Sequence, residues 1–231
     1  MDINVENQGA ILNQNDILSM AKIPSKTSKK DIYFYLKRIS DVVISGIGLI
    51  ILSPILLILS ILIKLDSNGP IIFSHKRIGK NGQEFKMYKF RTMYENAQEM
   101  IKQFTPEQMK EYKENYKLTN DPRITKIGKF LRKTSLDELP QLINIIKGDL
   151  SLIGPRPVIK EELEKYEDNK EKFLSVKPGL TGYWAANGRS NISYEDRMRM
   201  ELYYVDNMSF KLDIEIFFKT ILSVIKKEGA V

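Results

Sequence analysis

The strongest constraint on this chain is an uncharged apolar segment, Val42–Ile63, which lies between Asp41 and Lys64. As a straight helix it would be about 33 Å long, close to the roughly 30 Å of a bilayer's hydrocarbon core. A buried helix of a soluble protein would keep a polar face, which this segment lacks. A signal peptide fits poorly, because the segment starts late, is too long and precedes no small-x-small cleavage site. We therefore predict a membrane-inserted helix.

The residues of this helix leave two topologies open, a kinked single span and a re-entrant helix that dips into the bilayer and returns. Pro54 removes a backbone hydrogen bond and clashes with the carbonyl of Ile50, which predicts a kink, and the Ser53 hydroxyl can satisfy the released carbonyl. Both flanks are basic, and the positive-inside rule keeps basic flanks on the cytoplasmic side. These flanks, which favour the re-entrant form, are Lys29, Lys30, Lys37 and Arg38 before the segment and Lys64, Lys76, Arg77 and Lys80 after it.

Composition divides the chain into three parts and limits its chemistry. We predict a mobile polar tail over 1–30 with at most one short helix around 11–21, an anchor over 31–66, and a cytoplasmic domain over 67–231. The absence of cysteine excludes disulfides and thiolate chemistry, and a single histidine, His75, disfavours a zinc hydrolase. The chain carries 36 Lys and Arg against 29 Asp and Glu, a net charge of +7. This excess favours anionic partners: nucleic acid, acidic lipid or phosphorylated small molecules.

Local patterns predict an α+β domain that is mostly helical and contains one small β-hairpin. The turn signal Asn81-Gly82 separates two β-prone runs, and the segments beyond them have helical character. The predicted elements are strands over 71–78 and 84–90, two exposed helices over 94–118 interrupted by a proline, a Gly-rich aromatic loop over 177–190, and terminal helices over 194–231.

A basic amphipathic helix is predicted over 121–133, where Ile124, Ile127 and Leu131 recur at helical spacing. Basic residues fall largely on its other faces. Two interpretations remain open here. The helix either packs on the core as a surface helix, or lies at the lipid interface and faces acidic headgroups.

Two adjacent carboxylates, Asp137 and Glu138, follow this helix. Ser135 with Glu138 three residues later matches a capping box, which predicts a helix that begins here and ends at Gly148. The helix dipole would then favour the ionised carboxylates. Neighbouring helix residues point about 100° apart, so the pair is expected to have separate roles rather than to share a proton.

The carboxylate pair suggests phosphoryl chemistry. An ionised aspartate such as Asp137 can attack phosphorus, while Glu138 helps to hold Mg²⁺ across a diphosphate, with both carboxylates as candidate metal ligands. Arginine suits bidentate phosphate contact, and the prolines of Gly154-Pro155-Arg156-Pro157 restrict the backbone that presents a guanidinium. The alternative is that the two acids only cap a helix and that Arg156 only closes a loop. The predicted substrate-binding residues are Arg77, Lys89, Arg91, Arg132, Arg156 and Arg189.

These motifs resemble those of the bacterial sugar transferases, the monotopic polyprenyl-phosphate sugar-1-phosphate transferases, and in particular their polysaccharide-initiating branch. The resemblance covers about 31–231 in order. It rests on the anchor with Ser53-Pro54 and on the runs Lys-Phe-Arg-Thr-Met at 89–93, Arg-x-Thr-Ser-Leu-Asp-Glu-Leu-Pro-Gln at 132–141, Gly-Asp-Leu-Ser-Leu-Ile-Gly-Pro-Arg-Pro at 148–157 and Lys-Pro-Gly-Leu-Thr-Gly at 177–182.

The resemblance implies transfer of sugar 1-phosphate from a UDP-sugar to undecaprenyl phosphate with Mg²⁺, which releases UMP and initiates a surface glycan such as an exopolysaccharide or capsule. By this likeness Asp137 is the nucleophile that holds a covalent phospho-sugar, Glu138 assists it or the metal, and Arg132 and Arg156 bind phosphates or nucleotide. The likeness also implies a re-entrant anchor broken at Ser53-Pro54, and a catalytic domain on the cytoplasmic face of the bacterial inner membrane. Whether the chain forms a homodimer is left open.

A function from another class is a membrane-tethered basic protein that binds acidic lipid or nucleic acid without catalysis. Steep salt dependence, no Mg²⁺ requirement and no UMP release would identify it. The sequence shows no recognisable nucleic-acid module and no repeated basic-aromatic platform, so we predict no nucleic-acid partner.

Overall fold

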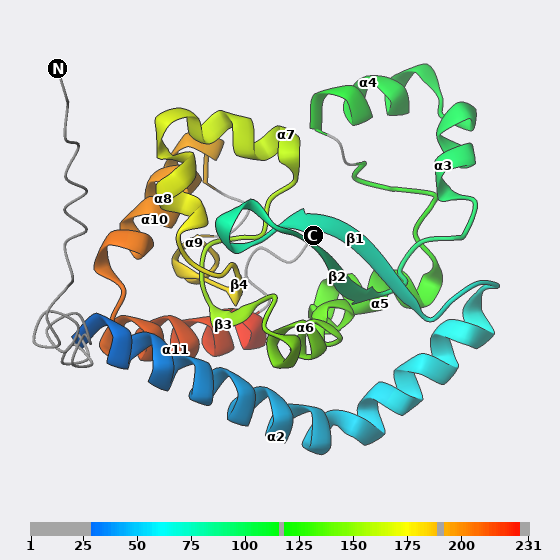
Figure 1. Ribbon diagram of the computed structural model, residues 1–231. Helices are drawn as coiled ribbons and strands as arrows, with labels where there is room; N and C mark the ends of the chain where they lie inside the picture. The colour runs from blue at the N-terminus through cyan, green and yellow to red at the C-terminus, as the bar shows by residue number, and fades with distance from the viewer. Residues whose placement is uncertain (1–28, 116–117, 189–191, 227–231) are drawn as a thin grey trace, which may run out of the picture.

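A computed structural model of the chain describes residues 29–115, 118–188 and 192–226. The predicted polar tail, the short helix around 11–21 and the candidate ligand Arg189 lie outside these residues. The described part is mostly helical with a small antiparallel hairpin, which confirms the predicted α+β class (Figure 1). The first half of the element order is α2 (Lys29–Asp66), β1 (Ile72–Ile78), η1 (Lys80–Gly82), β2 (Glu84–Phe90), α3 (Ala97–Met100), η2 (Ile101–Gln103), α4 (Pro106–Asn115), α5 (Lys126–Thr134), η3 (Leu136–Glu138) and α6 (Gln141–Lys147). The second half is β3 (Ser151–Ile153), α7 (Lys160–Leu163), η4 (Glu164–Asn169), α8 (Lys170–Leu174), β4 (Gly179–Thr181), α9 (Tyr183–Ala186), α10 (Tyr194–Asn207) and α11 (Phe210–Lys226).

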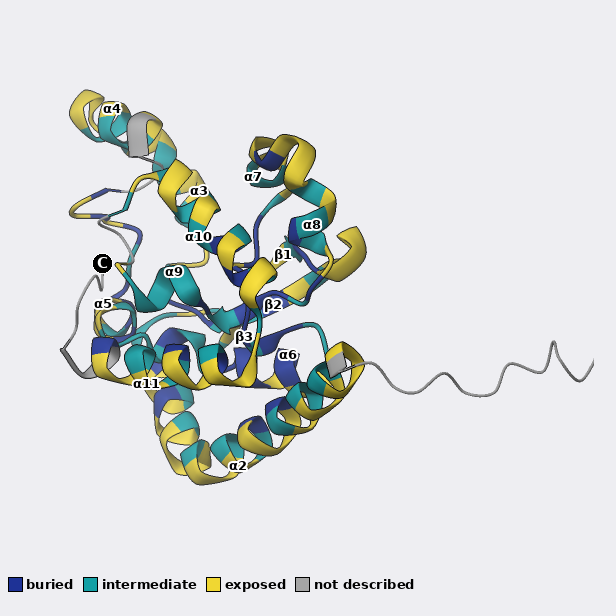
Figure 2. Cartoon of the chain, turned by 90° about the vertical axis from the view of Figure 1, so that its left-hand side faces the viewer, coloured by how far each residue is buried: buried dark blue, intermediate teal, exposed yellow. Residues whose placement is uncertain are grey.

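The apolar segment forms the middle of α2, which is long and apolar enough to cross a membrane. The helix continues through Pro54 and bends near its middle, so that both of its ends point back toward the rest of the molecule (Figures 1 and 2). The structure therefore has one bent helix, which agrees with the kink predicted from Pro54, and the helix is not interrupted at Ser53-Pro54 as the resemblance implies. The Ser53 hydroxyl donates a 2.7 Å hydrogen bond to the Ile50 carbonyl, as the sequence predicted.

The outer side of α2 is apolar and exposed, whereas parts of its inner side are buried. Ile50 is 75% exposed and Ile51 69%, but Leu59 and Ile63 lie in a core cluster with Phe90 of β2 and Leu131 of α5. A continuous apolar surface of this extent is typical of contact with lipid or another protein. The β-hairpin and α5 thus pack against the inner side of α2.

The predicted hairpin is confirmed, with an antiparallel register that pairs Ile72 with Phe90 and Ile78 with Glu84. Its connection is the short 3₁₀ turn η1, in which Asn81 and Gly82 have φ angles of 57° and 77°. Asparagine and glycine tolerate this left-handed region better than other residues, which explains the turn signal. The two strands are long enough to carry side chains from α2 to the far side of the domain.

The amphipathic prediction for the next helix is confirmed over a shorter range, because α5 begins only at Lys126 and Thr125 is its N-cap. Leu131 is completely buried against α2, while Phe130 is 51% exposed. The helix therefore packs on the core and also keeps an exposed apolar residue beside basic neighbours, so the structure contains features of both interpretations.

The motif at 148–157 and the motif at 177–182 are in direct contact through their backbones. Strand β3 pairs in parallel with β4, with Ser151 opposite Gly179. A Cβ atom added to Gly179 would lie 2.2 Å from the backbone nitrogen of Gly154, so neither motif tolerates a side chain at this contact. The predicted Gly-rich loop over 177–190 is therefore wrong in part. Its glycines allow close packing of β4, which α9 follows.

The predicted terminal helices are confirmed as α10 and α11. A buried polar network joins them to the anchor, because the Asp213 carboxylate of α11 accepts hydrogen bonds from Tyr33, Lys37 and Tyr204 at 2.7–2.9 Å. Lys37 and Asp213 also form an ion pair in which both side chains are 11% exposed. This network fixes α11 alongside the first half of α2 (Figures 1 and 2).

Candidate active site

The carboxylate pair lies on the 3₁₀ turn η3 rather than on an α-helix. Ser135 has a φ angle of 57°, ends α5, and makes no side-chain cap to the following turn, so the predicted capping box is wrong. Helix α6 begins only at Gln141 and ends, as predicted, at Gly148, which has a φ angle of 94°. The left-handed Ser135 turns the chain sharply and brings Asp137 back toward strand β2.

Lys89 of β2 lies between the two carboxylates. Its Nζ is 2.6 Å from Glu138 Oε1 and 3.8 Å from Asp137 Oδ2. Asp137 is buried, with 8% of its surface exposed, whereas the side chains of Lys89 and Glu138 remain more accessible. A single ammonium therefore compensates part of the charge of both acids and gives them separate environments.

Burial raises the pKa of Asp137 to about 6, an effect that Lys89 opposes, Glu138 reinforces and Arg132 opposes. This direction is opposite to the sequence prediction, which relied on a helix dipole that η3 does not supply. A carboxylate of this kind is ionised at neutral pH but weakly solvated, so it is more basic and more nucleophilic than an ordinary aspartate.

Arg132 lies at the same site and is held by the loop after β2. Its Nε donates a 2.9 Å hydrogen bond to Thr92 Oγ1, and burial lowers its pKa while Asp137 and Asp121 oppose that change. Gly128 allows this arrangement, because a Cβ atom there would lie 2.1 Å from the Thr92 carbonyl oxygen. The close contact between α5 and this loop positions the guanidinium beside the carboxylates.

Arg91 makes its hydrogen bonds elsewhere. The side chain is buried, and its Nη2 donates to the carbonyls of Ile63 and Ser67 and to the Ser67 hydroxyl at 2.6–3.3 Å. These acceptors lie at the C-terminal end of α2, where carbonyl groups lack helical partners. The structure therefore gives Arg91 a structural role at the end of the anchor, in contrast to the predicted contact with substrate.

A second cationic cluster surrounds Arg156. Arg77 and Arg197 both pair with Glu162, at 3.3 and 3.4 Å, and the guanidinium of Arg156 lies 5.6 Å from the centre of the Trp184 ring. Arg197 lies 5.6 Å from the same ring. Burial and the nearby charge of Arg156 lower the pKa of Arg77. Sequence reasoning missed Arg197 and Glu162, and only the aromatic loop hinted at Trp184.

A buried acid supports this cluster from behind. Glu201 is 1% exposed and accepts a 3.1 Å hydrogen bond from the backbone N–H of Arg156. Burial raises the pKa of Glu201 to about 7.

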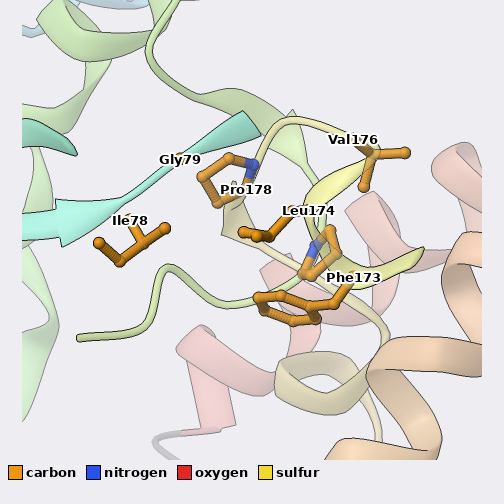
Figure 3. Close-up of a pocket in the computed structure, with 7 residues that line it drawn as sticks. Ile78, Gly79, Phe173, Leu174, Val176 and Pro178 are labelled. Carbon is orange, nitrogen blue, oxygen red and sulfur yellow. The ribbon is translucent and has the colours of Figure 1, made fainter. Parts of the chain in front are cut away.

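Figure 3 shows apolar packing beside the loop that carries Pro155 and Arg156. A pocket of about 10 Å³ there is lined by residues including Ile78, Phe173 and Pro155. That volume holds no more than about one water molecule, so the pocket serves packing and not ligand binding.

One face of the hairpin connects the carboxylates to the arginine cluster. Phe73 pairs with Lys89 and His75 with Met87, and residues two apart on a strand share a face, so His75 and Arg77 lie on the same face as Lys89. Burial lowers the pKa of His75, and the charges of Arg77 and Lys89 add to this effect. This face thus carries one cation near Asp137, Lys89, and one near Arg156, Arg77, and such a pair suits an extended polyanion with a reacting phosphorus at one end.

Asp137 and Glu138 are the carboxylates that this site offers to a magnesium ion. Within 29–115, 118–188 and 192–226 no group of three or more His, Cys, Asp or Glu side chains forms a metal cage. Mg²⁺ commonly uses only one or two carboxylates and completes its shell with waters and substrate phosphates. Asp137 and Glu138 fit this second mode and are the residues that would hold the ion.

Comparisons with known proteins identify the family of this chain. The family model described as bacterial sugar transferase matches residues 32–227. The chain is 44% identical over 214 residues to the undecaprenyl-phosphate galactose phosphotransferase of Salmonella typhimurium, a match that covers 91% of this chain and 44% of that protein. It is also 44% identical over 197 residues to the exopolysaccharide production protein ExoY of Rhizobium meliloti, covering 84% of this chain and 87% of that protein.

A third relative is an uncharacterized sugar transferase of Haemophilus influenzae, 48% identical over 198 residues, which cover 84% of this chain and 42% of that protein. The chain thus spans less than half the length of the Salmonella and Haemophilus relatives and most of the length of ExoY. The match to the family model, over 32–227, includes both the carboxylate turn and the arginine cluster. This chain therefore belongs to the bacterial sugar transferase family.

Proposed function

We propose that the protein transfers sugar 1-phosphate from a UDP-sugar to undecaprenyl phosphate through a covalent intermediate on Asp137. The observation that carries this proposal is the buried Asp137 carboxylate, which lies 3.8 Å from Lys89 and beside Arg132. Relatives named undecaprenyl-phosphate galactose phosphotransferase and UDP-galactose-lipid carrier transferase support the same reaction class. Relatives named exopolysaccharide production protein and galactosyl transferase support a role in making a surface glycan, which this reaction would initiate.

In the first half-reaction an Asp137 oxygen attacks the phosphorus that carries the sugar. The bond between this phosphorus and the bridging oxygen breaks, and UMP leaves with the electron pair. Lys89 and Arg132 offset the negative charge that accumulates on the phosphoryl oxygens. The cluster of Arg77, Arg156 and Arg197 is placed to hold the nucleotide part of the donor.

In the second half-reaction a phosphate oxygen of the lipid acceptor attacks the same phosphorus, and Asp137 leaves as a free carboxylate. The covalent step separates the two phosphorylated substrates in time, so their charges need not be brought together at once. Asp137 and Glu138 would hold Mg²⁺, which when bound neutralises diphosphate charge. Lys89 pairs with Glu138 at 2.6 Å and holds its carboxylate close to Asp137.

The position of α2 supports its insertion into the bacterial cytoplasmic membrane. The exposed apolar side of α2 is suited to lipid, and its bend points both ends toward the domain that carries Asp137 (Figure 2). We propose that α2 is re-entrant and that this domain lies on the cytoplasmic face. The acceptor phosphate, which cannot leave the headgroup layer, would then meet a nucleophile held at that depth.

The covalent step is tested by mixing enzyme and UDP-sugar without acceptor. We expect a burst of UMP equal to the enzyme concentration and a sugar-phosphate mass on the tryptic peptide over 134–147. Mass spectrometry after rapid quenching over a panel of UDP-sugars measures both results and identifies the donor. Asp206→Asn, an exposed change on α10, serves as the control that keeps the adduct. UMP release that requires acceptor and leaves no adduct would favour direct transfer.

The pKa of Asp137 predicts the pH dependence of this burst. Protonation removes the nucleophilic electron pair, so the burst rate should fall as pH drops through about 6, approaching tenfold per pH unit. Because Lys89 lowers this pKa, Lys89→Met should move the midpoint to higher pH. Quenched-flow measurements of UMP release between pH 5 and pH 8 check both expectations. A midpoint near 4, or a downward shift in Lys89→Met, would contradict the assignment.

The re-entrant topology is tested with single cysteines, which is straightforward because the chain contains none. Met20→Cys and Lys102→Cys lie on opposite sides of α2 in the sequence. In inverted and right-side-out membrane vesicles, a membrane-impermeant maleimide should label both positions only from the cytoplasmic side. Labelling of the two positions from opposite sides would establish a single span.

A further inference from the structure

A second cavity, of about 130 Å³, lies between the first half of α2 and the C-terminal part of the domain. Four basic side chains line it against one acidic side chain, Asp41. None of its lining residues belongs to the carboxylate turn or to the arginine cluster. The basic residues are Lys37, Arg38, Lys80 and Lys177.

Two of these cations are already engaged. Lys37 pairs with Asp213 at 2.7 Å, and Arg38 donates through Nη1 and Nη2 to the carbonyls of Ile145 and Ile146 at the C-terminal end of α6. Such carbonyls are the natural partners of a cation at a helix end. Asp213 therefore neutralises Lys37, whereas Arg38, which is held by uncharged carbonyls, keeps its positive charge beside the cavity.

The other two cations have no anionic partner in the described part of the chain. Neither Lys80 nor Lys177 has an ion pair or hydrogen bond from its ammonium there, although Lys80 lies 5.8 Å from the centre of the Phe34 ring. Burial lowers the pKa of Lys177, and the charge of Arg38 adds to this effect. Lys80 is exposed, whereas the Lys177 ammonium is partly buried without a direct partner, which is costly, and a bound anion would remove that cost.

A buried hydroxyl adds a donor to the same cavity. Ser151 is 2% exposed, and its Oγ lies near Asp41 without a hydrogen bond of ordinary geometry. The Asp41 carboxylate accepts a 2.9 Å hydrogen bond from the backbone N–H of Leu152, which offsets part of its negative charge. An acceptor oxygen in the cavity would therefore satisfy Ser151 and Lys177, and it would also lie within the field of the exposed Lys80.

The remaining lining of the cavity is mostly apolar, and part of it comes from α2. Phe34 of α2 and Met208 line the cavity. The next two residues of α2, Tyr35 and Leu36, are 69% and 45% exposed. In a membrane-seated α2 these exposed neighbours would contact lipid. The cavity would then meet the headgroup layer with apolar residues beside it.

We propose that this cavity binds the phosphate group of a membrane lipid. Lys80, Lys177 and the Ser151 hydroxyl contact the phosphate oxygens, and Phe34 and Met208 contact the first methylenes of the chain. The site rests on the proposed membrane seat of α2, but not on the chemistry of Asp137. Its ligand is either an anionic phospholipid or the polyprenyl phosphate acceptor, which share this phosphate chemistry.

The test compares Lys80→Gln/Lys177→Gln with Lys102→Gln/Lys110→Gln in the full chain. The control removes the same charge from exposed positions near α3 and α4, far from α2 (Figures 1 and 2). Native mass spectrometry from nanodiscs, with no donor present, measures retention of phosphatidylglycerol or undecaprenyl phosphate. The cavity variant should bind its lipid at least about tenfold more weakly, because it loses two charge-assisted contacts. The control should bind like the unaltered chain.

The two lipid sources give different results. Loss of phosphatidylglycerol with an unchanged KM for undecaprenyl phosphate identifies a phospholipid, whereas loss of undecaprenyl phosphate with a raised KM identifies the acceptor. Ser151→Ala guards against misfolding, since it should leave thermal stability without lipid unchanged and still weaken binding about threefold. Equal retention in both double variants, or equal loss in both, would overturn the proposal. Asp137→Asn should retain the lipid, so failure of this site and failure of the catalytic proposal are distinguishable.

Discussion

Replacement of Asp137 by asparagine is expected to lower UMP release by at least about a thousandfold, because an amide cannot form or release the phospho-sugar bond. The substitution keeps the shape of the side chain and removes only the nucleophilic oxygen. Glu138→Gln should be less damaging and should still form the adduct. The measurement is the initial rate of UMP release with saturating UDP-sugar and undecaprenyl phosphate. Substantial transfer by Asp137→Asn would exclude Asp137 as the nucleophile.

The same substitution should stabilise the fold. The pKa of Asp137 rises from an ordinary 3.8 to about 6, so the unfolded state ionises first and folding stability falls as pH rises across this interval. Below pH 3.8 the carboxyl is neutral in both states, and above pH 6 the full penalty, roughly 3 kcal/mol, is present. Asp137→Asn removes this penalty at pH 7.5.

Denaturant unfolding in detergent should therefore show an increase of up to about 3 kcal/mol in the unfolding free energy of Asp137→Asn. Asp206→Asn, which changes an exposed ion pair, should stay within about 0.5 kcal/mol. An inactive and less stable Asp137→Asn would mean that the loss of activity reflects misfolding rather than loss of the nucleophile.

Replacement of Asp213 by alanine is expected to cause the largest loss of stability outside the apolar core. It removes the common acceptor of Tyr33, Lys37 and Tyr204 and leaves the Lys37 ammonium buried without its partner. Breaking one side of a buried ion pair costs about 3–5 kcal/mol. For a chain of this size the melting temperature should fall by roughly 6–20 °C.

The matched control lies on the same helix. Glu215→Ala removes an exposed ion pair with Lys219 and should cost less than about 0.5 kcal/mol. Adding Lys37→Met to Asp213→Ala should restore part of the stability, because the unpaired charge is then gone. Thermal unfolding and limited proteolysis of α11 measure these effects. Equal melting temperatures for Asp213→Ala and Glu215→Ala would show that the network does not hold α11 to α2.

The roles of Arg91 and Arg197 depend on partners that are remote in the sequence. Arg91 was predicted to bind substrate, but its guanidinium donates hydrogen bonds to carbonyls at the end of α2. Arg197 and Glu162 were missed because their pairing depends on the docking of α10 against α7, which no local pattern reports. The orientation of a long side chain depends on its partners, and those partners are remote in sequence.

The sequence by itself determined the apolar anchor, the Ser53 bond to Ile50, the hairpin at Asn81-Gly82 and, through the family motifs, the carboxylate pair. These features depend on hydrophobic periodicity, turn conformation and residue chemistry, all of which act over a few neighbouring positions. Only the tertiary structure decided that Lys89, 49 residues before Glu138, lies between the two acids. It also decided that Asp137 is buried with a raised pKa, because burial and charge are set by packing between elements that are distant in the chain.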